Sequence, residues 1–298
     1  MVNAHKLYFT RITMLALFVS ISSFVWSQSK QIISCGTIKY ERKISLKKKL
    51  IESKDEDDDN FWMEEMIKKA PVNVVDQFIL QFNMTESNYS FDKKKDDGQF
   101  RMWGSDDVGM KNIVYKNFIN REQRSLKQFY DSDFLLMDSI KNFNWKLTSE
   151  FRDIAGYECR KATTIINDSL YVIAFYTDDI ICSTGPEGFS GLPGTIMGIV
   201  MPRLYCTWFA TSVEGFCDEN REIVKPVKGK KSTQSDLEAI LKDKFSKHKK
   251  WYYNGDVKKS KVHTKMSYND IKNKYGCTTL KSNTINCIAI YIYSDLFL

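Results

Sequence analysis

Metal-binding patterns are scarce in this 298-residue sequence, which has three histidines and no Cys-x-x-Cys pair among its seven cysteines. Structural and catalytic zinc sites need closely spaced Cys and His ligands. The two histidines beyond residue 27, His248 and His263, lie in polar, lysine-rich surroundings. We therefore expect no metal and no cofactor in this protein.

A long hydrophobic run is also missing. Residues 12–26 are apolar or small, but a helix that spans a bilayer needs about 20 such residues. Two basic residues precede this run, and Val25 and Ser27 stand before Gln28, which is the build of a secretory signal peptide rather than of an uncleaved anchor. We expect cleavage after residue 27 and export across the inner membrane. The mature protein would then be periplasmic, outer-membrane-associated or secreted, with no membrane span.

Strong basic charge is confined to the two ends of the chain. The formal net charge is +7 at pH 7, of which Lys6 and Arg11 supply two units. Residues 255–298, with seven lysines against three aspartates, supply four more. The remaining body, with about one net positive charge, lacks the electrostatic footprint of a nucleic-acid-binding protein.

Two familiar functional motifs are incomplete. Residues 188–190, Gly-Phe-Ser, begin like the nucleophile elbow G-x-S-x-G, but Leu192 stands where the last glycine belongs. The acidic run 55–59 has alternating aspartates like a calcium loop, yet Asn60 and Met66 replace the required glycine and glutamate. The sequence therefore predicts a solvated acidic loop and no serine nucleophile.

Period-two alternation dominates from residue 36 onward and predicts strands at short intervals. Parallel strands would need crossovers of about a dozen residues or more, so these intervals favour antiparallel pairing. We expect a mainly β (α+β) fold: a curved antiparallel meander or half-barrel of about 8 to 11 strands with one or two packed helices. The predicted strands are 36–45, 74–82, 87–92, 112–118, 125–130, 133–138, 143–150, 157–166, 169–177, 195–201 and 204–213.

Two helices are predicted within this pattern. Residues 62–70 form a short helix that ends at a proline. In the segment 235–250, Ser235 and Glu238 form a capping box, and apolar residues recur on one face of the helix. We expect this apolar stripe to pack onto the sheet.

The end of the chain differs from the body in composition. Residues 255–298 are crowded with lysine, asparagine, tyrosine and isoleucine, and the alternation fades. This tail is interpreted as a disordered extension, a terminal strand or the product of a shifted reading frame. We expect one β-rich domain at 28–254 between the signal peptide and the tail.

Four glycines crowd the stretch 188–200, GFSGLPGTIMGIV. Proline sets its own φ at about −65° and favours an extended residue before it, while glycine accepts a positive φ. Leu192-Pro193-Gly194-Thr195 therefore predicts a type II turn, followed by a buried strand at 195–201. We interpret the glycines as structural, because they bring a loop of about a dozen residues back into the sheet.

A disulfide is permitted in an exported chain. Folding 157–166 back on 169–177 brings Cys159 close to the end of the second strand, a few residues short of Cys182. A link between Cys159 and Cys182 is therefore conceivable. Connectivity does not follow from sequence, and the alternatives are Cys206 and Cys217.

The glycine-rich region also carries a family resemblance. Phe175-Tyr176-Thr177-Asp178-Asp179-Ile180, then Gly185-Pro186, then Gly191-Leu192-Pro193-Gly194-Thr195-Ile196 resembles the GLPGLI family of Bacteroidetes envelope proteins. Residues 36–42 and 154–162 are similar to other segments typical of that family, and the resemblance runs over residues 36–250. Thr195 and Phe175 depart from its usual leucine and tryptophan. The resemblance implies an envelope location and a β-rich architecture, but no reaction, because the family has no established activity.

Three classes of function are compatible with these features. The first, which we expect, is a binding or accessory module whose aromatic-rich strands hold an apolar ligand or a partner segment. The second is an envelope hydrolase that uses Asp178, Asp179 or Glu187, although these carboxylates are also typical of solvated loops and turns. The third is a structural partner of an outer-membrane protein, bound through an exposed sheet edge.

Overall fold

The computed structural model shows a mostly β fold, and all strands of the described residues belong to one open sheet of 12 strands. The structure describes residues 32–53, 61–94, 112–129, 132–166, 170–216, 222–237 and 239–240. The expected signal peptide at 1–27, the acidic run at 55–59 and the tail at 255–298 lie outside these stretches.

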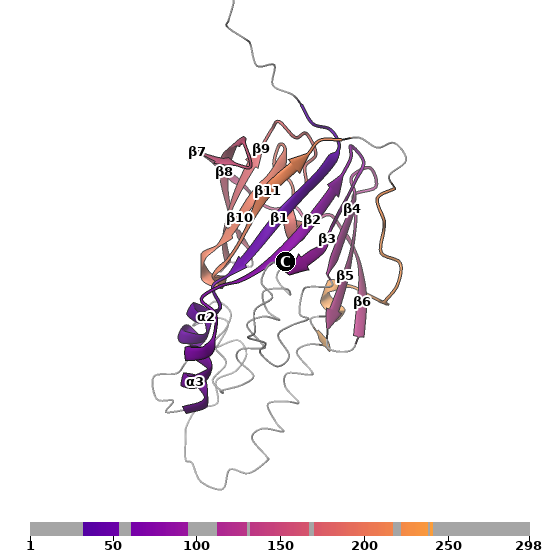
Figure 1. Cartoon of the computed structure of the whole chain (residues 1–298). Coiled ribbons are helices and arrows are strands. Elements are labelled where there is room, and N and C mark those ends of the chain that lie inside the picture. Colours follow the sequence, from indigo (N-terminus) through magenta and orange to yellow (C-terminus); the bar gives the residue numbers. More distant parts are fainter. Residues whose placement is uncertain are drawn as a thin grey trace, which may run out of the picture. The chain divides into compact units, whose positions relative to one another are not determined.

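Two meanders build this sheet, and they meet at the first strand of one and the last strand of the other (Figure 1). The first runs outward from β1 to β6, and the second runs inward from β7 to β11, which pairs antiparallel with β1. A short strand, β12, adds to β6 in parallel, so the sheet is mixed rather than wholly antiparallel as predicted. The strands are β1 (Gly36–Ile44), β2 (Val74–Phe82), β3 (Glu86–Lys94), β4 (Ile113–Asn117), β5 (Glu122–Phe129), β6 (Ser132–Ser139), β7 (Lys146–Ile154), β8 (Tyr157–Ile166), β9 (Leu170–Thr177), β10 (Thr195–Met201), β11 (Cys206–Glu214) and β12 (Lys230–Ser232).

Most strand positions agree with those expected from alternation, although the strand expected at 143–150 is found at Lys146–Ile154. The predicted strands 74–82, 157–166 and 195–201 coincide with β2, β8 and β10. The short strand β12 was not predicted, because three residues of sequence Lys-Lys-Ser carry no alternation. It forms because Lys230–Ser232 align beside the edge strand β6.

One helix was predicted and one was missed. The expected helix at 62–70 is α3 (Phe61–Lys69), whereas α2 (Leu46–Ser53) was not predicted. Leu46 and Leu50 stand one turn apart and are buried. Three consecutive lysines separate them, so the sequence shows no clear apolar stripe. Of the second expected helix, at 235–250, residues 234–237 and 239–240 are helical and the rest lies outside the described residues. Within the described part of the chain, no helix is long and apolar enough to cross a membrane.

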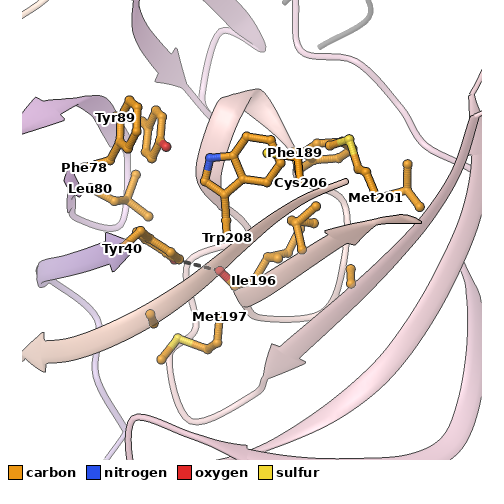
Figure 2. Packing of buried hydrophobic residues seen from close by; sticks show 14 of the residues in the cluster. Tyr40, Phe78, Leu80, Tyr89, Phe189, Ile196, Met197, Met201, Cys206 and Trp208 are labelled. Carbon is orange, nitrogen blue, oxygen red and sulfur yellow. Dashed lines mark hydrogen bonds between the residues drawn. The ribbon is translucent and has the colours of Figure 1, made fainter. Parts of the chain in front are cut away.

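Alternation sends one set of side chains to the face that we call the inner face. It is the face of Tyr40, and strand pairing places Phe78 and Ala210 beside Tyr40 on the same side. The rings of Phe78 and Tyr89 stack with centroids 5.1 Å apart, and Trp208 lies near them (Figure 2). These side chains, all 5% exposed or less, form the centre of the hydrophobic core.

The opposite, outer face is covered in two places. The β7–β8 hairpin brings the Arg152 guanidinium over the Phe209 ring, 4.7 Å from its centroid. On the other half of the sheet, the chain after β11 packs on β3, where the Asn88 side-chain amide donates to the Val224 carbonyl and Ile223 is buried. In both places an outward side chain of a strand gains a contact: Phe209 with a cation and Asn88 with a backbone carbonyl.

Candidate functional site

The segment that links β9 to β10, residues 178–194, is the motif loop, and it does not form a tight hairpin. It crosses the inner face instead and contacts the first meander. The hydroxyls of Thr184 and Ser87 (β3) share a hydrogen bond of 2.9 Å, and the Lys116 amine (β4) donates to the Phe189 carbonyl at 2.9 Å. Three strands, β11, β1 and β2, separate β10 from β3 in the sheet. The loop therefore joins distant parts of one sheet.

The return of the loop into β10 requires glycine at position 194. Gly194 has φ of +136°, and an added Cβ would lie 2.0 Å from the Thr177 carbonyl oxygen. The predicted positive φ is thus confirmed. The hydrogen bond of this turn runs from the Gly194 N–H to the Leu192 carbonyl at 2.8 Å, which closes a three-residue turn rather than the predicted four-residue one.

Hydrogen bonds then fix the start of β10. The Thr195 hydroxyl donates to the Cys182 carbonyl at 2.5 Å, and the Ile196 N–H donates to the Thr184 carbonyl at 2.8 Å. From β1, the Tyr40 hydroxyl donates to the Ile196 carbonyl at 2.6 Å (Figure 2). The last two residues of the hexapeptide motif therefore hold the loop to the core.

Most of the other motif residues predicted from the sequence are buried. Tyr176 and Thr177 end β9, and Ile180 forms a parallel bridge with Ile33. Gly185 is extended, and a Cβ there would lie 2.7 Å from the Ile196 Cβ. The exposed members are Gly191 and Pro193, and the buried ones are Tyr176, Thr177, Ile180, Gly185, Pro186, Leu192, Gly194, Thr195 and Ile196. Their burial is what a structural role predicts.

A short 3-10 turn, η1 (Pro186–Gly188), occupies the middle of the loop. Glu187 has left-handed backbone angles, φ 51° and ψ 26°, and Gly188 follows with φ of +87°. Left-handed angles are uncommon for a residue other than glycine. They place Glu187, which is 5% exposed, near Tyr89. Burial is the main cause that raises the pKa of the Tyr89 hydroxyl, and the negative charge of Glu187 is the next.

Three other charged residues are buried on the inner face. The Arg42 guanidinium donates to the Asp76 carboxylate at 2.9 Å and lies over the Phe78 ring. Lys116 is 1% exposed, and burial lowers the pKa of its amine to about 7, because an ammonium is poorly solvated in the interior. These residues were not predicted, although each replaces an apolar residue at an inward position of an alternating strand, which is a usable signal.

Aromatic side chains close the far end of the loop. The Trp145 indole N–H donates to the Ser190 carbonyl at 2.9 Å, and the Phe143 and Phe189 rings lie 5.1 Å apart. Ser190 itself is 2% exposed. A serine nucleophile must be reached by its substrate, so this burial agrees with the structural interpretation of residues 188–190.

The carboxylates proposed for a hydrolase occupy different surroundings. Asp178 is exposed where β9 ends, and Asp179 is half-buried next to it. Glu187 is buried against Tyr89 of β3. The loop therefore separates Asp178 from Glu187, with one carboxylate in solvent and the other in the interior. Among the described residues, no three His, Cys, Asp or Glu side chains gather as a metal site would need.

The link between Cys159 and Cys182 that the sequence made conceivable is not formed in the structure. Cys159 and Cys182 are buried free thiols, whereas Cys35 is disulfide-bonded. The hairpin geometry did bring β8 and β9 together, but Cys182 lies beyond β9, in the part of the motif loop that turns toward β10. Burial raises the pKa of both Cys159 and Cys182 to about 12.

Comparison with known proteins identifies the same region. The family described as "Protein of unknown function (Porph_ging)" matches residues 166–198, which comprise the end of β8, β9, the motif loop and the start of β10. This match covers a short part of the chain. No curated protein matches the sequence.

The fold is distantly similar to some solved structures. PNGF-II in a C2 crystal form aligns with a TM-score of 0.44 and 17% identity, over 70% of this chain and 32% of that chain. PNGF-II in a P21 form aligns with a TM-score of 0.40 and 19% identity, over 67% and 32%. An uncharacterized conserved protein from Thermus thermophilus aligns with a TM-score of 0.33 and 5% identity, over 66% and 90%. The chain thus spans about a third of the length of PNGF-II.

Proposed function

We propose that this protein is an exported cell-envelope binding or accessory module, related to the GLPGLI proteins. In this proposal the sheet curves into a half-barrel, and its inner face holds an apolar ligand or a segment of a partner protein. The contacts of the motif loop with β3 and β4 support the curvature, because they join it to strands beyond the middle of the sheet.

The observation that carries the proposal is how the inner face holds the loop. Three side chains, Tyr40 of β1, Lys116 of β4 and Trp145 before β7, each donate a hydrogen bond to a backbone carbonyl of the loop or of the first residues of β10. Backbone carbonyls are present in every peptide, so such contacts tolerate different side chains. At the same place Phe189 fills apolar surface. A partner segment would use the same donors, and an apolar ligand would use the surface that Phe189 covers.

Binding of a fluorescent fatty acid, cis-parinaric acid, to the purified mature protein tests this function. We expect saturable binding, and tighter binding by Phe189→Ala, because that truncation frees the surface that Phe189 covers. The matched control is Phe151→Ala, which truncates an exposed ring on β7 and should leave binding unchanged. Absence of saturable binding in the wild type and in Phe189→Ala would overturn the apolar-ligand proposal.

The proposed location has its own test. Fractionation of the native host, followed by mass spectrometry of the amino terminus, should find the protein in the envelope fraction with Gln28 as its first residue. Recovery of the protein in the cytoplasm with residues 1–27 attached would contradict export.

A hydrolase remains the second candidate, and the backbone of Glu187 is the observation in its favour. Residues held at left-handed angles are concentrated at functional sites, and this one places a carboxylate next to Tyr89. If the protein hydrolyses envelope esters, glycans or peptides, Glu187→Gln should abolish turnover and leave the folded protein intact. Activity of the wild type that survives this substitution would remove Glu187 from consideration.

The sheet edge supports the third candidate, an outer-membrane partner, less well. β7 is the last strand of the order, and most of its residues are exposed. A bulge between Leu147 and Phe151 interrupts its register, and Lys161 pairs with Glu150 at 2.7 Å inside the bulge. Bulges and charges of this kind protect edge strands from pairing with other chains.

A further inference from the structure

A few hydrogen bonds hold the middle of the motif loop, residues 183–191, which we call the strap, to the first meander and to the segment before β7. Thr184 contacts Ser87, the Phe189 carbonyl accepts from Lys116, and the Ser190 carbonyl accepts from Trp145. The strap contributes no strand to the sheet. Lifting it breaks the bond from the Ile196 N–H to the Thr184 carbonyl but leaves the pairing of β9 with β10 intact, as local opening requires.

Lys116 is the contact that carries a titratable group. Ser87 on β3 and Gln123 on β5 flank it directly in the sheet, and neither carries a charge. Cys182 of the motif loop favours the charged amine, and Lys141, between β6 and β7, disfavours it. The acid of the strap, Glu187, acts on Tyr89 instead. When Lys116 is protonated in the closed state, its ammonium therefore lies in the interior with no carboxylate among these flanking groups.

We propose that the strap is a pH-responsive cover of the inner face, latched by neutral Lys116 and released when that amine takes up a proton. Release carries the ammonium into water and uncovers Val114, which lies beneath Gly188. The inference goes beyond the proposed function, because opening of the strap is measured with no ligand present.

The direction of the pH dependence follows from linkage. In the closed state the pKa of Lys116 is about 7, and in an open state it returns toward 10.5. The open state therefore binds more protons between these two values. Opening should become more frequent as the pH falls from 10.5 toward 7, and it should level off below pH 7.

Hydrogen exchange on the full mature protein tests the proposal, with each rate corrected for the intrinsic dependence of exchange on pH. The informative amides are that of Ile196, which donates to the Thr184 carbonyl of the strap, and those of Phe189 and Gly191 within the strap. From pH 9 to pH 6 we expect their opening constant to rise by about ten- to a hundredfold. Amides in the middle of β8 should show no comparable rise. Equal changes in both sets, or no change in either, would overturn the proposal.

Substitution of the latch gives the second measurement. Lys116→Met should remove the pH dependence of the strap amides, because it removes the titrating amine. The matched control is Lys161→Met, which removes a lysine of β8 paired with Glu150 and should leave that dependence unchanged. Persistence of the pH dependence in Lys116→Met would overturn the role of Lys116. If Lys116→Met does not fold, the wild-type comparison of pH 6 with pH 9 still decides.

Tryptophan emission gives a readout that needs no substitution at Lys116. The Trp145 indole binds the strap, so the difference between the spectra of the wild type and Trp145→Phe isolates its signal. We expect that difference spectrum to shift to longer wavelength from pH 9 to pH 6, as the indole becomes hydrated. A difference spectrum that is the same at both values would count against strap release.

Discussion

Two turns with glycine at positive φ show how differently the same residue is used in this molecule. In the β7–β8 hairpin, Ala155 and Gly156 have φ of 51° and +84°, and an added Cβ on Gly156 would meet nothing within 4 Å. In the motif loop, Gly194 has φ of +136°, and a Cβ there would lie 2.0 Å from the Thr177 carbonyl oxygen. Glycine at the hairpin relieves backbone strain alone, whereas glycine in the loop also makes room for a neighbouring strand.

The largest effect is expected for Gly194→Ala. The clash with Thr177 is with backbone, which cannot move without breaking the pairing of β9 with β10, so we expect a loss of more than about 3 kcal/mol in the free energy of unfolding. Urea denaturation measures it. Gly194→Asn should be equally harmful although asparagine tolerates positive φ. A stable Gly194→Asn protein would mean that φ alone selects glycine here, as at the hairpin.

The next largest effect concerns the buried charge beneath the loop. The pKa of Lys116 is lower in the folded protein, at about 7, than its ordinary value of 10.5, so the unfolded chain binds more protons between these values. Stability should therefore rise with pH from 7 to about 10, by up to about 1.4 kcal/mol per pH unit. Above that range the buried hydroxyls of Tyr40 and Tyr89, whose pKa is raised, oppose the rise.

Urea denaturation of Lys116→Met at pH 7 and pH 9.5 checks this expectation. The variant should lose the increase that the wild type shows, because methionine fills a similar volume without a titrating group. The exposed hairpin contains no counterpart to this buried amine, so Lys161→Met, whose side chain is partly exposed, should keep the increase. Equal slopes in the wild type and Lys116→Met would contradict the prediction.

A smaller effect is expected at the hairpin turn. Gly156→Ala should lower the free energy of unfolding by about 1 kcal/mol, since alanine is strained at positive φ but meets no atom. Gly156→Asn should cost less, because asparagine tolerates left-handed angles. Urea denaturation of the two variants beside the Gly194 pair measures the steric part separately from the part due to φ. A loss at Gly156 as large as that at Gly194 would remove the distinction between the turns.

The smallest effect is expected for thiol reagents on the folded protein. Burial raises the pKa of Cys182 in the loop and of Cys159 in β8 to about 12, so few thiolates exist at pH 8 to react. Iodoacetamide followed by peptide mapping should label both slowly, and both should react in urea. If the strap opens as proposed, Cys182 should be labelled before Cys159. Rapid labelling of Cys159 in the folded state would contradict its burial.

Sequence alone determined the local features of this protein. Alternation placed β2, β8 and β10 at their observed bounds, and the proline and glycine of the motif predicted a positive φ at Gly194. These features depend on residues within a few positions of one another. Alternation also places Arg42, Asp76 and Lys116 at inward positions of their strands, but the burial of these charged residues was not predicted.

Only the tertiary structure decided which segments meet. The pairing of β1 with β11 joins residues such as Thr37 and Glu214, and the contacts of the loop with Lys116 and Ser87 join residues 73 and 97 positions apart. Period-two alternation is equally satisfied by any neighbour strand, so it cannot choose partners at such separations. That choice depends on packing of the whole inner face, which also buries Lys116 and thereby lowers the pKa of its amine.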